Sequence, residues 1–182
     1  TEFPGSSQDG APVQTLLYAG WAAHSGVSLY AYPHGGAASP VSCPLVTDLS
    51  DACTLDQALA LANTGDTVIL EADPGTGSEA TFATATGWDV PQESLTIRPG
   101  SGVDATLDGG GTAPRLLDYT GSGTLTVSDL TVANTVGSTD PSTAGGGIVN
   151  RGGGDLVVSG STFTGNTATG DGGSAAGGGI VN

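Results

Sequence analysis

The chain has 182 residues, the usual length of one domain, and glycine is unusually frequent at 32 residues. Three arginines, no lysine and eighteen acidic residues give a net charge of −15. This charge argues against nucleic acid or an anionic membrane surface as a partner, and no apolar run is long enough for a membrane span.

The N-terminal segment 1–42 differs from the rest of the chain because aromatic residues are concentrated in it. Its runs 13–21 and 27–32 have the composition of β-strands. We expect a separate aromatic segment, either a hairpin that covers one end of the fold or an arm that pairs with another chain. His24 and His34 have no partner at a nucleophile-activating spacing, and we interpret both as surface or loop residues. The candidate partner-binding residues are Tyr18, Trp21, Tyr30 and Tyr32.

Cys43 and Cys53 are the only cysteines, and their surroundings lack the ligand spacing of a zinc site. We therefore predict a disulfide that closes a short loop, which places the protein in an oxidising compartment. The chain starts at Thr1 without a signal-type apolar run, which is typical of a mature, exported form. The expected location is secreted or cell-surface.

A disulfide-closed capping region is expected over residues 43–65, with one helix at 54–63. Thr54 and Gln57 have the spacing of a capping box, and Leu55 and Leu59 recur at helical spacing. The following segment, 71–92, has the glycine and proline content of a long loop with one edge strand.

Short β-type runs separated by Gly, Asp, Asn or Pro continue over residues 66–182. The string Ala-Gly-Gly-Gly-Ile-Val-Asn occurs at 144–150 and again at 176–182, a shift of 32, which indicates a solenoid. Asparagine recurs every sixteen residues, so we expect Asn134 to stack on Asn166 and Asn150 on Asn182. Because the chain stops within a repeat, we expect this solenoid to be truncated at its C-terminal end.

The stretch 52–63 followed by 65–70 resembles the Cys-Ser-Leu-Arg-Glu-Ala motif domain, which opens many secreted and surface right-handed parallel β-helix proteins of bacteria. The Gly-Gly-Gly-Ile-Val-Asn segments, and the segment 161–168, are similar to repeats of polymorphic outer-membrane proteins. Asp56 and Gln57 depart from the Arg-Glu of the motif. The resemblance implies an all-β fold, a right-handed parallel β-helix with an N-terminal cap that contains one short α-helix. It carries no catalytic residues.

Right-handed β-helices include polysaccharide lyases and hydrolases, so a catalytic site must be considered. The segment 107–118 resembles an Asp-Gly-x-Gly stretch of such enzymes, and it offers weak candidates that also fit turn chemistry and a salt bridge. These candidates are Asp104, Asp108, Arg115 and Asp118. The sequence favours a protein without catalytic activity.

Calcium is the one ion that the sequence suggests, because several aspartates fall near the corners of the repeats. The weak candidates are Asp129, Asp140, Asp155 and Asp171. The sequence contains no EF-hand loop and no nonapeptide calcium repeat, and no other cofactor is expected.

These features together predict an extracellular structural or adhesive module of a cell-surface or secreted fibre. Its expected partners are other copies of the chain, in a head-to-tail homo-oligomer, or a protein or glycan of a cell surface. The alternative is a polysaccharide lyase or hydrolase on the same scaffold. The enzyme predicts carboxylates gathered on one sheet face beside a groove, whereas the adhesive module predicts scattered carboxylates.

Overall fold

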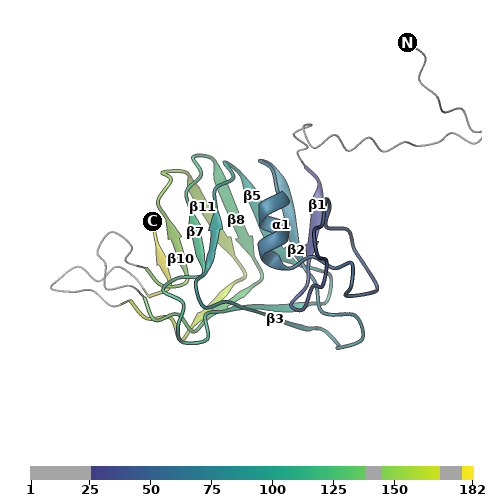
Figure 1. Cartoon of the computed structure of the whole chain (residues 1–182). Coiled ribbons are helices and arrows are strands. Elements are labelled where there is room, and N and C mark those ends of the chain that lie inside the picture. Colours follow the sequence, from purple (N-terminus) through teal and green to yellow (C-terminus); the bar gives the residue numbers. More distant parts are fainter. Residues whose placement is uncertain (1–25, 138–144, 169–177) are drawn as a thin grey trace, which may run out of the picture.

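The computed structural model describes residues 26–137, 145–168 and 178–182. These residues form three parallel β-sheets and one short α-helix (Figure 1). The all-β class with parallel strands is therefore confirmed. The strand expected at 13–21 lies outside the described residues, as do Tyr18, Trp21, His24, Asp140 and Asp171.

All neighbouring strands within the three sheets pair in parallel. Sheet A contains β1 (Ser28–Ala31), β2 (Asp66–Leu70), β5 (Leu95–Pro99), β8 (Thr124–Ser128) and β11 (Asp155–Ser159). Sheet B contains β3 (Glu79–Ala83), β6 (Asp104–Asp108), β9 (Thr131–Ala133) and β12 (Thr162–Thr164). Sheet C contains β4 (Trp88–Val90), β7 (Leu117–Tyr119), β10 (Ile148–Asn150) and β13 (Ile180–Val181).

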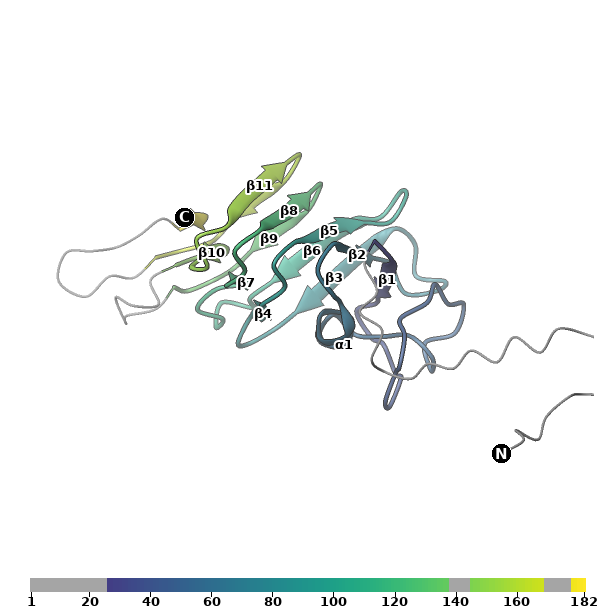
Figure 2. The same cartoon turned by 90° about the horizontal axis from the view of Figure 1, so that it is seen from above.

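From β2 onward the chain visits the sheets in a fixed order. The strands β2, β3 and β4 lie in sheets A, B and C, and this order is followed four times up to β13. We call each passage a round. Successive rounds lie side by side, from α1 at one end to β11 at the other (Figure 2). Backbone hydrogen bonds therefore join each round to the next.

The core lies between the three sheets and is filled by every second residue of the strands. In β8, Leu125 and Val127 are fully buried, whereas Thr126 between them is only partly buried. Leu125 is in register with Leu95, and Val127 with Ile97. The apolar side chains thus form continuous columns through the rounds, which is the two-residue period of a half-buried strand.

The helix α1 (Leu55–Leu61) covers the end of the stack beside β1 and β2 (Figure 1). Thr54 is its N-cap, and the predicted capping box with Gln57 is confirmed. Its buried face consists of Leu55, Ala58 and Leu59, which belong to the core cluster. The helix is shorter than the predicted range 54–63 because its C-cap, Ala62, already has extended backbone angles. No helix within the described ranges has the length and apolar character that a membrane span requires.

The segment before the helix is part of the sheet. The strand predicted at 27–32 is observed as β1, and it pairs in parallel with β2 as the first strand of sheet A. A disulfide joins Cys43 and Cys53, as predicted. The N–H of Tyr30 donates to the carbonyl of Cys43 at 2.8 Å, and the N–H of Tyr32 to that of Cys53 at 2.9 Å. Residues 26–42 therefore continue into the cap, with β1 as the end strand of sheet A.

The segment 71–92 contains two strands, β3 and β4, where the sequence predicted a loop with one edge strand. Phe82 and Trp88 are buried core residues of these strands. Of the residues that suggested a loop, Pro74, Gly75 and Gly77 lie between β2 and β3, and Gly87 lies between β3 and β4. The prediction failed because these turn residues were taken as evidence for a loop over the whole segment, whereas they form only the connections between strands.

Threonine forms columns on the outer faces of two sheets. On sheet B, four threonines of successive rounds are in register, and on sheet A three are. Cross-strand pairs of this β-branched residue stabilise a sheet. The members are Thr81, Thr106, Thr131 and Thr162 on sheet B, and Thr67, Thr96 and Thr126 on sheet A.

Candidate functional site

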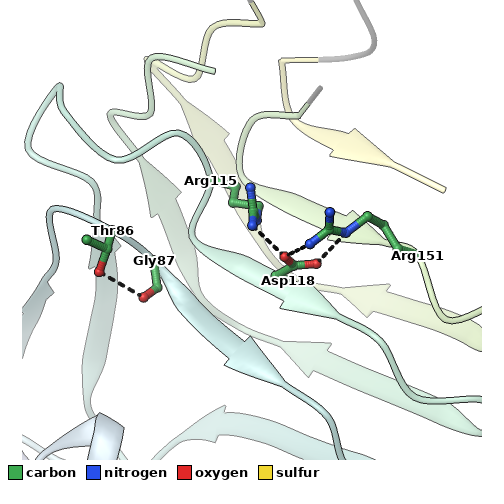
Figure 3. A network of polar contacts seen from close by, with 5 residues as sticks. All are labelled: Thr86, Gly87, Arg115, Asp118 and Arg151. Atoms are coloured by element: carbon green, nitrogen blue, oxygen red, sulfur yellow. Dashed lines mark hydrogen bonds and ion pairs between the residues drawn. The ribbon is translucent and has the colours of Figure 1, made fainter. Parts of the chain in front are cut away.

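Asp118 is the centre of a polar network on sheet C (Figure 3). Arg115 contacts its Oδ2 atom at 2.7 Å, and Arg151 from the next round binds both carboxylate oxygens, with Nε to Oδ1 at 2.9 Å. The side chain of Asp118 is only 3% exposed. The salt bridge expected between Arg115 and Asp118 is thus present, and the second arginine adds a link between two rounds.

The other two catalytic candidates lie on sheet B. Asp104 and Asp108 are the first and last residues of β6, and both point away from the core. Asp108 accepts the N–H of Gly110 at 2.9 Å and the side-chain amide of Asn134 at 2.9 Å, which is the behaviour of a turn residue. No hydrogen bond or ion pair between these described residues joins them to Asp118. The structure therefore separates the four candidates into two pairs on two different sheets.

A groove of about 330 Å³ lies between α1 and β4. Asp56 and Leu59 of α1 form one side, and Trp88 and Asp89 of β4 form the other, followed by Gln92. Asp56 and Asp89 are exposed, whereas Leu59 and Trp88 are buried. Asp89 is also in register with Asp118 on the neighbouring strand β7. From the sequence, Asp56 and Leu59 were considered only as residues of the helix, and no residue was predicted to line a groove.

Gln92 fixes the end of the helix to this groove. Its side-chain amide donates to the carbonyls of Leu59 at 2.7 Å and Ala62 at 3.3 Å. Carbonyls at the end of a helix have no partner within the helix, so a side chain that binds them stabilises the helix end. The remaining oxygen of Gln92, Oε1, is buried without a partner, and so is the indole Nε1 of Trp88.

The two asparagine pairs differ from each other. Asn150 donates its amide to the amide oxygen of Asn182 at 2.5 Å, so these two side chains meet as expected. Asn166 instead accepts the N–H and the hydroxyl of Thr135, at 3.2 and 3.1 Å. Asn134, which has a left-handed φ of 60°, therefore does not stack on Asn166, and that expectation is wrong.

A change in the repeat length explains this difference. Strands β9 and β12 are in register with a shift of 31 residues, as Thr131 faces Thr162, whereas Ile148 of β10 faces Ile180 of β13 with a shift of 32. The sixteen-residue spacing assumed a shift of 32 for both pairs. Glycine allows the close contact at the longer shift, because a Cβ atom on Gly146 would lie 1.6 Å from the carbonyl oxygen of Gly178.

The two described aromatic candidates have different surroundings. Tyr32 is 2% exposed, and its hydroxyl accepts the N–H of Val46 at 3.0 Å, so it belongs to the cap and is not available to a partner. Burial raises its pKa above the ordinary value. Tyr30 is partly buried. His34 lies on the surface, as expected, but its Nδ1 atom is 2.5 Å from the carboxylate of the buried Asp73.

Three further ionisable groups have a pKa shifted by their surroundings. Burial raises the pKa of Glu71, while the nearby Arg98 opposes this shift. Burial also raises the pKa of Tyr119, whose hydroxyl donates to the carbonyl of Glu93. The N–H of Ser50 lowers the pKa of Asp48, which lies in the disulfide loop. Asp48 lies in the cap, Glu71 follows β2 of the first round and Tyr119 ends β7 of the second, and none of them lines the groove.

The calcium candidates do not form a site in the described part of the chain. Asp129 occupies the turn between β8 and β9 with a φ of 58°, and Asp155 is the first residue of β11. Among the residues that the structure describes, no three His, Cys, Asp or Glu side chains are grouped as metal ligands. The structure therefore gives no support to the calcium prediction.

Comparisons with protein-family models, with curated proteins and with solved structures found no match to this chain.

Proposed function

We propose that this protein is an extracellular structural or adhesive module, built as a right-handed parallel β-helix with a helical cap. The fixed order in which the chain visits three parallel sheets supports this fold. The helix α1 over the first round and the motif-like stretch around it support the resemblance to the Cys-Ser-Leu-Arg-Glu-Ala motif domain. The disulfide between Cys43 and Cys53 supports a secreted or cell-surface location.

The observation that carries the proposal is the engagement of the candidate catalytic groups in structural bonds. Both oxygens of Asp118 accept from arginine side chains, and its side chain is only 3% exposed, so the arginines shield this carboxylate from a substrate. Asp108 holds a turn and the side chain of Asn134. These interactions join turns and rounds to one another, which is what a rigid scaffold requires.

A polysaccharide-acting enzyme is the second candidate, and one observation favours it. Asp89, which lines the groove, is in register with Asp118 on the adjacent strand of sheet C. Adjacent strands are about 4.8 Å apart, which is close to the carboxylate separation of about 5–5.5 Å in retaining glycosidases. The arginines bound to Asp118 argue against this role.

Head-to-tail assembly, which the sequence suggested, would place the last round of one copy against the first round of the next. At that end β1 is the outermost strand of sheet A (Figure 1), and the N–H groups of Tyr30 and Tyr32 already donate to the carbonyls of Cys43 and Cys53 in the disulfide loop. An incoming copy would therefore meet the cap instead of a free strand edge at sheet A. We therefore place surface binding ahead of self-assembly. The mass in solution, measured with and without a chelator, separates the two.

The test of the proposed function is a combined binding and release assay. Purified protein is incubated with immobilised neutral and acidic polysaccharides and with intact cells, and both retention of the protein and soluble products are measured. We expect retention without release of reducing ends or unsaturated uronates. Release of either product by the protein, and its loss in Asp118→Asn, would establish the enzyme instead.

A further inference from the structure

We infer that this protein cuts its own chain at the peptide bond between Asp73 and Pro74. The bond lies in the connection between β2 and β3, and four residues around it carry the argument: His34, Asp73, Pro74 and Thr76. The inference goes beyond the proposed function, because cleavage neither requires nor excludes binding to a cell surface. The expected products are the fragments 1–73 and 74–182.

Aspartate followed by proline makes a peptide bond that breaks unusually easily in mild acid. The side-chain carboxyl group of an aspartate can attack the backbone carbonyl of the same residue, because the product is a cyclic anhydride. A carboxylate is a known protein nucleophile, and an attack within one residue needs no encounter of separate groups. Proline is a favourable leaving group, since its nitrogen belongs to a tertiary amide. The reactive pair is therefore present in the sequence, and its surroundings decide how fast it reacts.

The carbonyl of the bond between Asp73 and Pro74 is held by two donors. The N–H of Thr76 donates to the carbonyl oxygen of Asp73 at 3.1 Å, and the hydroxyl of Thr76 donates to the same oxygen at 2.8 Å. Negative charge moves onto this oxygen when the carbonyl carbon is attacked, and two fixed donors stabilise that charge as an oxyanion hole does. The turn at 73–76 therefore supports the reaction as well as the fold.

The carboxyl group of Asp73 is oriented by His34, which follows β1. The Oδ2 atom of Asp73 is 2.5 Å from Nδ1 of the imidazole, and its Oδ1 atom accepts the backbone N–H of His34 at 3.3 Å. The side chain of Asp73 is 8% exposed, whereas that of His34 is 80% exposed. The imidazole can thus take a proton from water and share it with the buried carboxyl group, which is the task of a general acid.

The reaction conserves atoms and charge and needs only water. Oδ1 of Asp73 bonds to the carbonyl carbon of the same residue, and the bond from that carbon to the nitrogen of Pro74 breaks. The proton shared between His34 and Oδ2 passes to this nitrogen, which leaves as a secondary amine. Water then opens the anhydride and leaves two carboxyl groups on Asp73. Residues 74–78 are exposed, so water reaches the site, and the net reaction is hydrolysis of one peptide bond.

Cleavage would leave the fold assembled. The first fragment keeps β1, α1 and β2 together with the disulfide, and the second fragment begins just before β3. Strand β2 pairs in parallel with β5 along its full length, and the core cluster contains residues of both fragments. The product is therefore a module of two chains, in which non-covalent contacts alone attach the cap to the later rounds.

A second bond of the same type provides an internal control, because Asp140 is also followed by a proline, Pro141. The purified protein is incubated at about pH 5.5, where histidine side chains readily exchange protons, and the fragments are identified by mass spectrometry. We expect the 73–74 bond to be cut at least about ten times faster than the 140–141 bond. The two rates should become similar once guanidinium chloride unfolds the protein. Without denaturant, the two fragments should elute together in size-exclusion chromatography.

Variants of the site separate the roles of its residues. Asp73→Asn removes the nucleophile and should abolish cleavage at this bond. His34→Gln can donate a hydrogen bond but cannot pass on a proton, and Thr76→Val removes one donor to the carbonyl; each should slow the cleavage at least about tenfold. The matched control is Thr112→Val, because the N–H and hydroxyl of Thr112 donate to the carbonyl of Gly109 in the same way, at 2.9 and 3.2 Å. This control should leave the rate unchanged, and circular dichroism confirms that each variant is folded.

The inference is overturned if the 73–74 bond of the folded protein is cut no faster than the 140–141 bond, or if unfolding leaves the difference between the two rates unchanged. It is also overturned if His34→Gln and Thr76→Val are both cut at the rate of the parent, since the bond would then break without help from its surroundings. A slower rate in either variant supports it. None of these results touches the proposed function, which retention of the uncut protein on glycans and cells tests separately.

Discussion

The first and the last round have the same strand pattern but different burial. In β2 of the first round, Val68 and Leu70 are fully buried, since β1 and α1 lie on one side and β5 on the other. In β11 of the last round, Val158, which the register connects to Val68 through Ile97 and Val127, is only partly buried, as is Leu156. Within the described residues, β11 pairs with β8 alone. Burial in this fold therefore depends on a neighbour on each side, and the cap supplies that neighbour for the first round.

The largest expected effect comes from an interior leucine. Leu125→Ala should lower the free energy of unfolding by about 2–5 kcal/mol, because the side chain is fully buried between two rounds. The matched variant Leu156→Ala, at the same strand position one round later, should cost less than half as much. Urea unfolding of both variants measures the difference, and equal losses would contradict the comparison between the rounds.

Removal of the disulfide tests the cap. Cys43→Ser together with Cys53→Ser should destabilise the protein by about 2–4 kcal/mol, because the bond closes the loop that holds β1 against the first round. Hydrogen exchange should become faster in β1 and α1 and stay unchanged in β8. Uniformly faster exchange would show that the cap and the rounds unfold as one unit.

The network at Asp118 links the second round to the third. Asp118→Asn should cost about 1–3 kcal/mol, since it weakens the hydrogen bonds from Arg115 and Arg151. This loss of stability is smaller than that expected when a fully buried ion pair is broken. The reason is that the side chain of Arg151 is 36% exposed, so water can solvate its guanidinium group in the variant. Asp89→Asn on the adjacent strand is the control. An equal effect of both variants on thermal unfolding would reject a special role for the network.

The smallest effect is expected from Glu71, next to the cap. Its carboxylate occupies space that a side chain at Gly100 would fill, and burial raises its pKa in the folded state. The contribution of Glu71 to stability is therefore complete below its unfolded pKa of about 4.5 and is lost as the pH rises through the higher folded pKa. Glu71→Gln should stabilise the protein at pH 7 and have no effect at pH 3.5, as measured by urea midpoints. A larger gain in stability at pH 3.5 than at pH 7 would contradict a raised pKa of Glu71 in the folded state.

Local features of the fold could be predicted from the sequence. The capping box at Thr54 and Gln57 and the disulfide loop involve residues that are close in the chain. Turn residues and β-type runs likewise marked β5, β6 and β8. In each of these, the physical cause acts over a few residues.

Features that depend on the register between rounds could not be predicted. The threonines of sheet B are 25, 25 and 31 positions apart in sequence, so no fixed period reveals their column. The pairing of Asn134 with Asn166 failed because one extra residue lies between β12 and β13. The groove was missed for the same reason, since Gln92 reaches α1 from 33 positions away. When the repeat length varies, the contacts between residues far apart in sequence depend on the register of the folded strands, which the sequence does not reveal.

Retention and release on polysaccharides test the account most directly. The purified protein is applied to immobilised neutral and acidic glycans, and the bound protein and the soluble products are measured in the same sample. We expect retention of the protein on at least one glycan and no reducing ends or unsaturated uronates in solution. Release of such products would contradict the proposed adhesive module and establish an enzyme instead.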